Sequence, residues 1–283
     1  MLLRPRSLVD VADDPRATRA TLASMRAFPN GAARAGVGRH YIVDWEFAWF
    51  FKLPIDIIAP FVPPGMRPFQ PDAQRKYGLI HLGYIKMRPG NLRSESHPRG
   101  LPAFEELTWG VQAQPYERDW KLPYTFVANR LAGNHRTFRE VSRDVDHYPI
   151  YDTDDIQFRP NLNEYSVSVV ADGKTICELS LGATLSGDKA EVDRRYAVLP
   201  VPAEVVKPGP NGTLYRNTFN FLGLVRRIEA HELDTSAVHK LHDHAFFDGL
   251  FASPLAIPIP YAVMMSRPGT LAAQIIGATR RVR

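Results

Sequence analysis

The sequence predicts a mainly β fold of the α+β class, an antiparallel β-barrel or cone with a few flanking helices. From residue 39 onward, short apolar stretches follow one another, separated by turn signals. Hairpin signals also recur between apolar stretches, as Asp-Gly at 172–173, Ser-Gly-Asp at 186–188 and Asn-Gly at 211–212. Because no helix intervenes between these hairpins, the pattern favours antiparallel strands in a closed or nearly closed sheet.

The elements follow in order along the chain. Residues 1–38 are expected to form a separate arm, with a helix over 15–28 where apolar residues recur at helical spacing. Residues 39–283 are expected to form a single domain that opens with an aromatic-rich strand over 40–51. A short helix over 54–61 should end before two prolines and a glycine. Further strands are predicted over 79–87, 106–114, 165–170, 175–181, 190–199 and 214–222.

Length and composition indicate an ordinary globular protein. A chain of 283 residues, 45% apolar and 23% charged, can bury a core without disulfides. Cys177 is the single cysteine, so no intrachain disulfide can form and a cytoplasmic location is expected. The first residues lack the apolar core of a signal peptide. No apolar run approaches the ~20 residues that cross a bilayer, so no membrane contact is expected.

The net charge of +5 comes from 35 basic and 30 acidic residues. The arginines are scattered, and only the tail at 280–283 forms a basic cluster. Nucleic-acid-binding proteins usually concentrate basic charge on one face, so no nucleic-acid partner is expected. The small positive excess mildly favours anionic ligands.

Several common cofactor motifs are missing from the sequence. It contains no dinucleotide-binding, P-loop or nucleophile-elbow pattern, and no cofactor is expected. The densest histidine cluster is His239, His242 and His244, next to Asp243. It lacks the zincin pattern, and a structural role for Asp243 or His244 at backbone groups is the preferred interpretation. We therefore predict no metal site.

Two adjacent carboxylates, Glu105 and Glu106, lie at the start of a predicted strand. Side chains alternate along a strand, so one carboxylate should point inward and the other outward. An inward glutamate in an apolar pocket would have a raised pKa and could act as an acid or a base. From these residues alone, a surface pair remains the alternative.

The strand at 79–87 carries a lysine between apolar residues. In strict alternation Lys86 shares a face with Ile80, Leu82 and Tyr84, while His81, Gly83, Ile85 and Met87 take the other. A desolvated lysine can attack a carbonyl, although a lysine near the strand end can also reach solvent. Lys86 is therefore a catalytic candidate, and His81 is a candidate substrate-binding residue.

Three polar rings surround Pro149. His147, Tyr148 and Tyr151 could each donate a hydrogen bond to a carbonyl or a carboxylate at the mouth of a pocket. Cys177 lies in an apolar stretch, which indicates a buried and unreactive thiol.

Three segments, taken in order, resemble the acetoacetate decarboxylase superfamily. The first is 53–66 (LPIDIIAPFVPPGM), like the early helix of that family. The second is 138–141 (FREV) followed by Tyr148-Pro149, like the family's G-R-E-L and Y-P-K-K elements. The third is 243–245 (DHA) with prolines behind it, like F-D-H-A-x-A-P-L. The resemblance covers roughly residues 40–265 and implies a β-barrel or cone with a buried, largely apolar cavity.

The resemblance also shows what this chain lacks. In the family's decarboxylases a lysine directly after Tyr-Pro forms a Schiff base, and a second lysine beside it lowers the pKa of the first. Here these positions hold Ile150 and Tyr151, and a shifted alignment would place Asp146 there; neither Ile150 nor Asp146 can form an imine. The substrate-contacting arginine of the family would fall near Asp44. The resemblance implies that Glu106 is a pocket acid, that Ile150 contacts the substrate and that the protein is a homo-oligomer.

Three functional hypotheses follow. The first is an enzyme of the lyase, hydratase, isomerase or cyclase type. It would act on a small or medium carbonyl or carboxylate compound without a lysine imine, with Glu106 as acid or base and Tyr151 polarising the carbonyl oxygen. The second is a Schiff-base decarboxylase or aldolase-type lyase that uses a relocated lysine such as Lys86. The third is a non-catalytic protein that binds a small molecule.

The second hypothesis extends to other lysines of the chain. Lys52 and Lys121 are further candidates. The other lysines indicate turn or surface positions; they are Lys76, Lys174, Lys189, Lys207 and Lys240.

Overall fold

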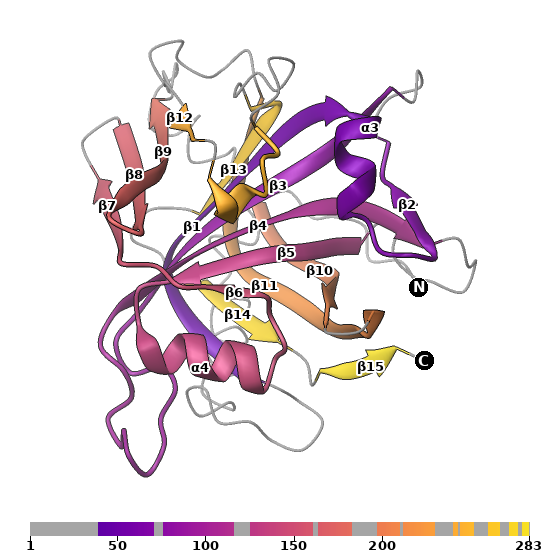
Figure 1. Ribbon diagram of the computed structural model, residues 1–283. Helices are drawn as coiled ribbons and strands as arrows, with labels where there is room; N and C mark the ends of the chain where they lie inside the picture. Colours follow the sequence, from indigo (N-terminus) through magenta and orange to yellow (C-terminus); the bar gives the residue numbers. More distant parts are fainter. Residues whose placement is uncertain are drawn as a thin grey trace.

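The computed structural model describes residues 39–70, 76–115, 125–160, 164–182, 197–209, 212–229, 240–242, 244–251, 260–266, 272–276 and 279–282. The proposed arm at 1–38, the turn at 186–188, Lys121, Lys189 and His239 lie outside these residues. In the described part of the chain, two β-sheets and a few short helices form the fold (Figure 1).

The larger sheet contains eleven strands in the described residues. Its long strands are β1 (Arg39–Pro54), β3 (Tyr77–Met87), β4 (Phe104–Pro115), β5 (Thr125–Gly133), β10 (Ala197–Pro208) and β11 (Leu214–Glu229). Its shorter strands are β2 (Met66–Pro68), β6 (Ile150–Tyr151), β13 (Ala262–Ser266), β14 (Ala272–Ile276) and β15 (Arg280–Val282). The smaller sheet has the order β12-β9-β8-β7. Its strands are β7 (Asp155–Pro160), β8 (Glu164–Ala171), β9 (Lys174–Gly182) and β12 (Lys240–Leu241).

The larger sheet is mixed, which corrects the prediction of an antiparallel barrel or cone. Most neighbouring strands are antiparallel, but β5 runs parallel to both β10 and β6. β5 also pairs with β4 in the antiparallel sense. Hairpin signals report only the strands that they connect. They carry no information about pairings between distant segments, such as β5 with β10.

Several predicted elements match the structure closely. The strand predicted over 40–51 is β1, and the helix predicted over 54–61 is α3 (Ile55–Ile58) followed by the 3-10 turn η1 (Ala59–Phe61). The Asp-Gly signal joins β8 to β9, and both of its residues have positive φ, at 51° and 68°. That backbone conformation is the one for which Asp-Gly is favoured in tight hairpins. Helix α4 (Arg136–Asp144) was not predicted.

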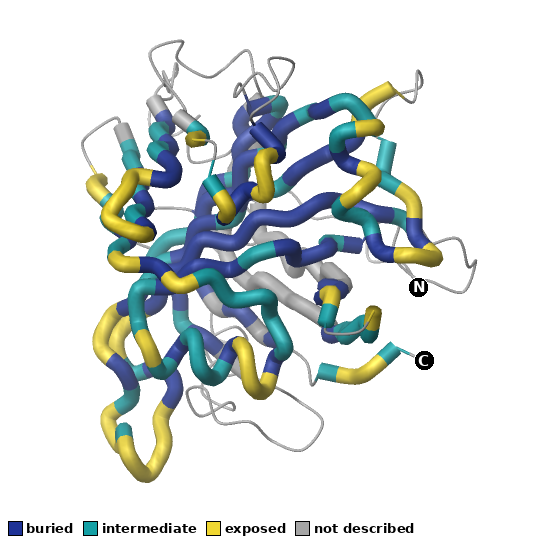
Figure 2. Tube along the Cα trace, in the orientation of Figure 1, coloured by how far each residue is buried: buried dark blue, intermediate teal, exposed yellow. Residues whose placement is uncertain are grey.

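Two apolar cores hold the fold together. The larger core lies between the two sheets and includes Phe47, Trp49, Tyr84 and Trp109. The smaller core lies beneath α4 and includes Tyr41, Phe104 and Phe138. Figure 2 shows that buried residues follow the long strands, whereas exposed residues follow the connections. Cys177 is buried in the larger core as a free thiol.

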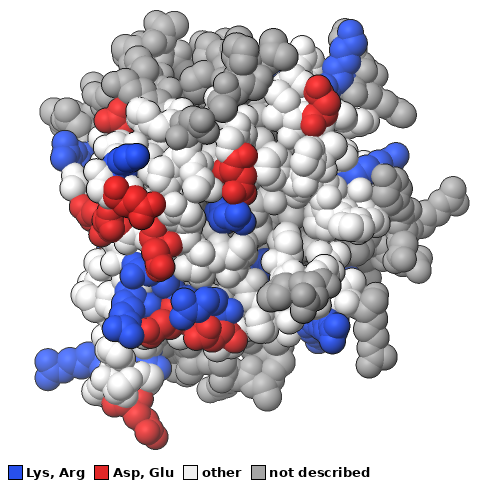
Figure 3. Space-filling view, viewed as in Figure 1, with Lys and Arg blue, Asp and Glu red and all other residues white. Residues whose placement is uncertain are grey.

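The charged side chains are mixed in sign on the face drawn in Figure 3. Around α4 they form ion pairs, Arg136 with Glu140 at 2.7 Å and Arg139 with Asp152 at 3.5 Å. None of the helices in the described segments is long and apolar enough to cross a membrane.

Candidate active site

A cavity of about 140 Å³ lies between the larger sheet and α4. Its wall is built by residues of β1, β3, β4 and β5, with further contributions from β10, β13 and β14. The helix α4 supplies Phe138 and Ser142, and the chain directly after it supplies Asp146 and Tyr148. An engineered cavity of roughly 150 Å³ binds benzene in another protein, so this one has room for a small organic molecule.

The registers of three neighbouring strands arrange the cavity wall in rows. Glu46 of β1, Ile85 of β3 and Glu106 of β4 lie directly beside one another. Adjacent strands are about 4.8 Å apart, so the backbones that carry the two glutamates are roughly 10 Å apart. Both glutamates line the cavity, on either side of Ile85.

Small side chains create the space above this first row. The next row along the strands contains Ala48, Gly83 and Thr108. All three line the cavity. A Cβ at Gly83 would lie 3.3 Å from Nε2 of His81. The imidazole of His81 therefore packs directly against the glycine.

A β-bulge turns Glu46 toward the cavity. The register between β1 and β3 shifts between Val43 and Trp45, where Asp44 is the additional residue. Side chains alternate along a strand, and one extra residue reverses which positions face inward. Tyr41 before the bulge and Glu46 after it therefore both line the cavity. Sequence reasoning did not select Glu46, although its alternation with the aromatic residues at 45, 47 and 49 was an available signal.

A second bulge shapes the opposite wall. The register between β4 and β5 shifts after Trp109, which leaves Asn129 as the additional residue. The Asn129 amide accepts a hydrogen bond from the Val111 backbone N–H at 3.2 Å and donates one to the Phe61 carbonyl at 3.1 Å. These contacts fix the bulge, and Phe126 and Leu131 on its two sides both line the cavity.

Burial raises the pKa of both glutamates. Desolvation is the main cause of the rise for Glu46, and the nearby Glu106 adds to it, bringing the pKa to about 8. The pKa of Glu106 is also raised to about 8, chiefly by burial and further by Asp146. Near neutral pH, both carboxyl groups are therefore mostly protonated and can donate hydrogen bonds.

Burial has the opposite effect on His81. Its imidazole lies between the rings of Phe50 and Phe126, with both ring centroids 4.8 Å away. Desolvation lowers the pKa of His81 to about 4, so the ring is neutral at physiological pH. Nε2 is buried without a hydrogen-bond partner among the described residues, and His81 lines the cavity.

Tyr148 lines the cavity from the segment that follows α4. Burial is the main cause that raises the pKa of its phenol. The Lys207 ammonium lies 4.6 Å from the centroid of the Tyr148 ring and 3.2 Å from the Thr279 hydroxyl. Lys207 is fully buried, which corrects its prediction as a turn or surface residue. No turn begins at this position, because β10 includes Lys207 and pairs it with Tyr215 of β11.

Lys86 lies on the opposite face of β3 from the cavity. Its ammonium is 3.7 Å from the Glu105 carboxylate and 5.6 Å from the centroid of the Phe158 ring. Lys86 and Glu105 are also directly opposed in the register of β3 and β4. Lys86 therefore does not reach the wall that Glu106 helps to form.

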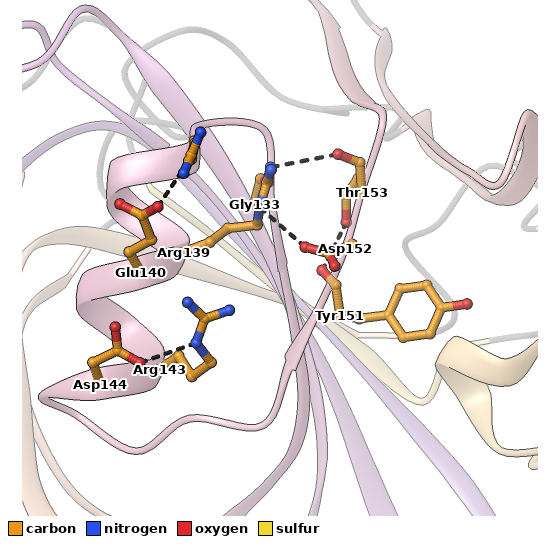
Figure 4. A network of polar contacts seen from close by, with 9 residues as sticks. Gly133, Arg139, Glu140, Arg143, Asp144, Tyr151, Asp152 and Thr153 are labelled. Carbon is orange, nitrogen blue, oxygen red and sulfur yellow. Dashed lines mark hydrogen bonds and ion pairs between the residues drawn. The ribbon is translucent and has the colours of Figure 1, made fainter.

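Three residues around Pro149 also lie away from the cavity. Figure 4 shows Tyr151 pointing away from α4, and its hydroxyl donates a hydrogen bond to Asp172 at 3.3 Å. The ring of His147 stacks on Tyr215 with a centroid separation of 4.0 Å. Ile150 pairs with Leu131 and packs against the core beneath α4. Of residues 146–151, Asp146 and Tyr148 are the ones that line the cavity.

The histidine cluster is only partly described. Nδ1 of His244 accepts a hydrogen bond from the Phe246 backbone N–H at 3.1 Å, at the start of the 3-10 turn η4 (Ala245–Phe247). Within the described residues, no group of three or more potential ligands is placed to hold a metal ion.

Comparison with solved structures identifies the fold. An acetoacetate decarboxylase from Legionella pneumophila subsp. pneumophila strain Philadelphia 1 superposes with a TM-score of 0.58 at 13% identity, over 87% of this chain and 88% of that one. Another acetoacetate decarboxylase structure gives 0.56 at 14% identity, over 90% and 91%. This protein has the acetoacetate decarboxylase-like fold. The enduracididine biosynthesis enzyme MppR shares it, with a TM-score of 0.56 at 13% identity over 86% of each chain.

The likeness is one of structure rather than of sequence. No family model and no curated protein matches the sequence of this chain. At such low identity, the comparison speaks for the shared fold alone. The chemistry of this protein has to be argued from the side chains in its own cavity.

Proposed function

We propose that this protein is an enzyme that catalyses acid–base chemistry on a small carbonyl compound in the cavity, without a lysine imine. One observation carries the proposal. Glu106 is 8% exposed, lines the cavity and has a pKa raised to about 8. A carboxyl group with such a pKa exchanges its proton near neutral pH, as a general acid or base must.

Glu46 provides a second carboxyl group for the same reaction. At pH 7 a group with a pKa of about 8 is ionised in about one molecule in ten. In the proposed step, one glutamate is ionised and removes a proton from the carbon next to the carbonyl. The other glutamate is protonated and donates its proton to the carbonyl oxygen, so that an enol forms. The reverse transfer regenerates the carbonyl compound, as an isomerase or lyase requires.

The remaining polar groups would orient the substrate. Neutral His81 and Tyr148 line the cavity and serve as hydrogen-bonding partners in this proposal. Lys86 and Tyr151 have no part in it, because the first pairs with Glu105 and the second donates to Asp172. The fold neighbours acetoacetate decarboxylase and MppR are enzymes, which supports an enzymatic role.

Hydrogen exchange tests this proposal. The protein is incubated in D₂O with small uncharged ketones, and loss of the protons next to the carbonyl is followed by NMR. We expect exchange above the buffer rate with the native protein and a loss of at least 100-fold in Glu106→Gln. Glu140→Gln, in the exposed ion pair on α4, should retain the native rate. Exchange that is unchanged in Glu106→Gln would refute the assignment.

The position of Lys207 favours a second candidate function. Its buried ammonium lies behind the ring of Tyr148, so an imine at Lys207 replaces the earlier suggestion of Lys86. Borohydride added to the same mixtures would then leave a covalent adduct, detected by mass, that is lost in Lys207→Ala. Probe binding without either exchange or adduct would instead support simple ligand binding.

A further inference from the structure

The ionisable groups in the cavity wall are acids and a neutral imidazole. Glu46, Glu106 and Asp146 line the cavity, together with His81 and the phenols of Tyr41 and Tyr148. Among the described lining residues there is no lysine or arginine. Sites that hold a carboxylate usually offer it such a cation, often as a bidentate arginine. The described residues of this wall offer none.

A buried cation, Lys207, contacts one of the residues of the wall. The ammonium of Lys207 is over the ring of Tyr148 and within hydrogen-bonding distance of Thr279. Lys207 itself does not line the cavity. A carboxylate in the cavity would therefore meet the acidic groups directly, whereas the Lys207 ammonium contacts the Tyr148 ring and the Thr279 hydroxyl.

The wall does offer hydrogen-bond donors to an uncharged ligand. Glu46 and Glu106 are mostly protonated near neutral pH, because burial raises the pKa of each to about 8. Gln274 is 1% exposed and lines the cavity next to Glu46, and its side-chain hydrogen bond opposes part of the burial-driven rise in the pKa of Glu46. A ligand oxygen buried in the cavity needs a hydrogen-bond donor, and the protonated carboxyl groups can supply one.

We propose that the cavity selects uncharged carbonyl compounds and excludes the corresponding carboxylates, because acidic groups and an amide, rather than cations, face the ligand. This inference rests on the proposed function in taking the cavity as the substrate site. It names the substrate class more narrowly, as a ketone, aldehyde, ester or amide rather than a keto acid. The apolar remainder of the wall, including Phe50, Phe126 and Ile85, suits the carbon skeleton of such a compound.

Two probes of nearly the same shape test this selection. Pentan-2-one is uncharged, and butanoate replaces its methyl group by a negative oxygen. Binding is measured at pH 6.5 with the full chain, by calorimetry or ligand-observed NMR. We expect pentan-2-one to bind at least tenfold more tightly than butanoate. Tighter binding of butanoate, or no binding of either probe, would overturn the proposal.

Substitution of the glutamates tests the stated cause. At pH 9 both glutamates of the native protein are ionised and accept rather than donate, so the affinity for pentan-2-one should fall at least fivefold. The double variant Glu46→Gln/Glu106→Gln keeps amide donors at every pH. Its own affinity for the ketone should therefore change by less than twofold between pH 6.5 and pH 9. Glu140→Gln should follow the native protein. If the affinity of the double variant fell between pH 6.5 and pH 9 as much as that of the native protein, the two glutamates would not be the donors.

These binding measurements are independent of catalysis. Binding of pentan-2-one over butanoate without any hydrogen exchange would leave the selection intact and refute the proposed enzymatic step. Hydrogen exchange together with tighter binding of butanoate would leave the enzymatic step intact and refute the selection.

Discussion

Two kinds of titratable side chain face the same cavity, and burial moves their pKa values in opposite directions. Glu46 and Glu106 keep their protons to a pH of about 8, whereas His81 stays neutral down to about 4. In the unfolded chain, glutamates ionise near 4.5 and histidine protonates near 6.5. The folded state therefore binds more protons at the glutamates and fewer at the histidine than the unfolded state does.

The glutamates should make the protein less stable as the pH rises. The pKa of each is raised on folding, so its stabilising contribution is lost between pH 4.5 and 8. We expect the free energy of unfolding of Glu46→Gln, relative to the native protein, to rise by roughly 2–5 kcal/mol between pH 5 and 8.5. Urea unfolding at several pH values measures this difference. A difference that does not vary with pH would show that Glu46 is ionised in the folded state, and Glu140→Gln serves as control.

The strands position the cavity through two bulges and a few glycines. Gly110 is the critical glycine, because a Cβ there would lie 2.0 Å from the Val127 carbonyl oxygen and 2.7 Å from the ring of Phe126. At Gly83 the nearest atom belongs to the side chain of His81, at 3.3 Å. A backbone oxygen that also pairs two strands cannot move aside, whereas an imidazole can shift slightly.

Alanine at these two glycines should therefore have different effects. Gly110→Ala should lose at least roughly 3 kcal/mol of stability or fail to fold, because it separates β4 from β5. Gly83→Ala should fold and change stability by less than about 1.5 kcal/mol. It should nevertheless bind pentan-2-one at least tenfold more weakly, because the methyl group occupies the cavity. Thermal unfolding and ligand titration measure both effects. Equal stability of the two variants would contradict the close approach of β5 at Gly110.

In the molecule as a whole, the cavity and the contact between the two sheets lie on opposite faces of β1 and β3. The contact is aromatic, with Phe158 of β7 placed 5.2 Å from Trp45, 5.7 Å from Phe47 and 5.3 Å from Tyr84 between ring centroids. None of these four residues lines the cavity. Stability and ligand binding should therefore be separable.

Removal of the ring at Phe158 tests this separation. Phe158→Ala should reduce the free energy of unfolding by roughly 2–4 kcal/mol, because it empties space between the sheets. The affinity for pentan-2-one at pH 6.5 should remain within threefold of the native value. Urea unfolding and ligand titration on the same samples measure the two quantities. A folded Phe158→Ala variant that no longer binds the ketone would place the ligand between the sheets instead of beneath α4.

Local sequence signals determined the strands and hairpins that depend on neighbouring residues. The Asp-Gly hairpin at 172–173 and the opposite orientations of His81 and Lys86 on β3 follow from positive φ and from two-residue alternation. Alternation placed one of Glu105 and Glu106 inward, and only the resemblance to the decarboxylase superfamily favoured Glu106. A resemblance in the order of three short segments indicated the fold.

Only the tertiary structure decided which other side chains share the cavity. Glu46 faces inward because a bulge at Asp44 reverses the alternation of β1, and a bulge is a property of two paired strands. Asp146 and Tyr148 face inward, and Ile150 does not, because the segment after α4 is held against β5. Lys207 is buried because β10 pairs with β11 up to Leu214. Each outcome depends on contacts between residues distant in sequence, which local patterns do not encode.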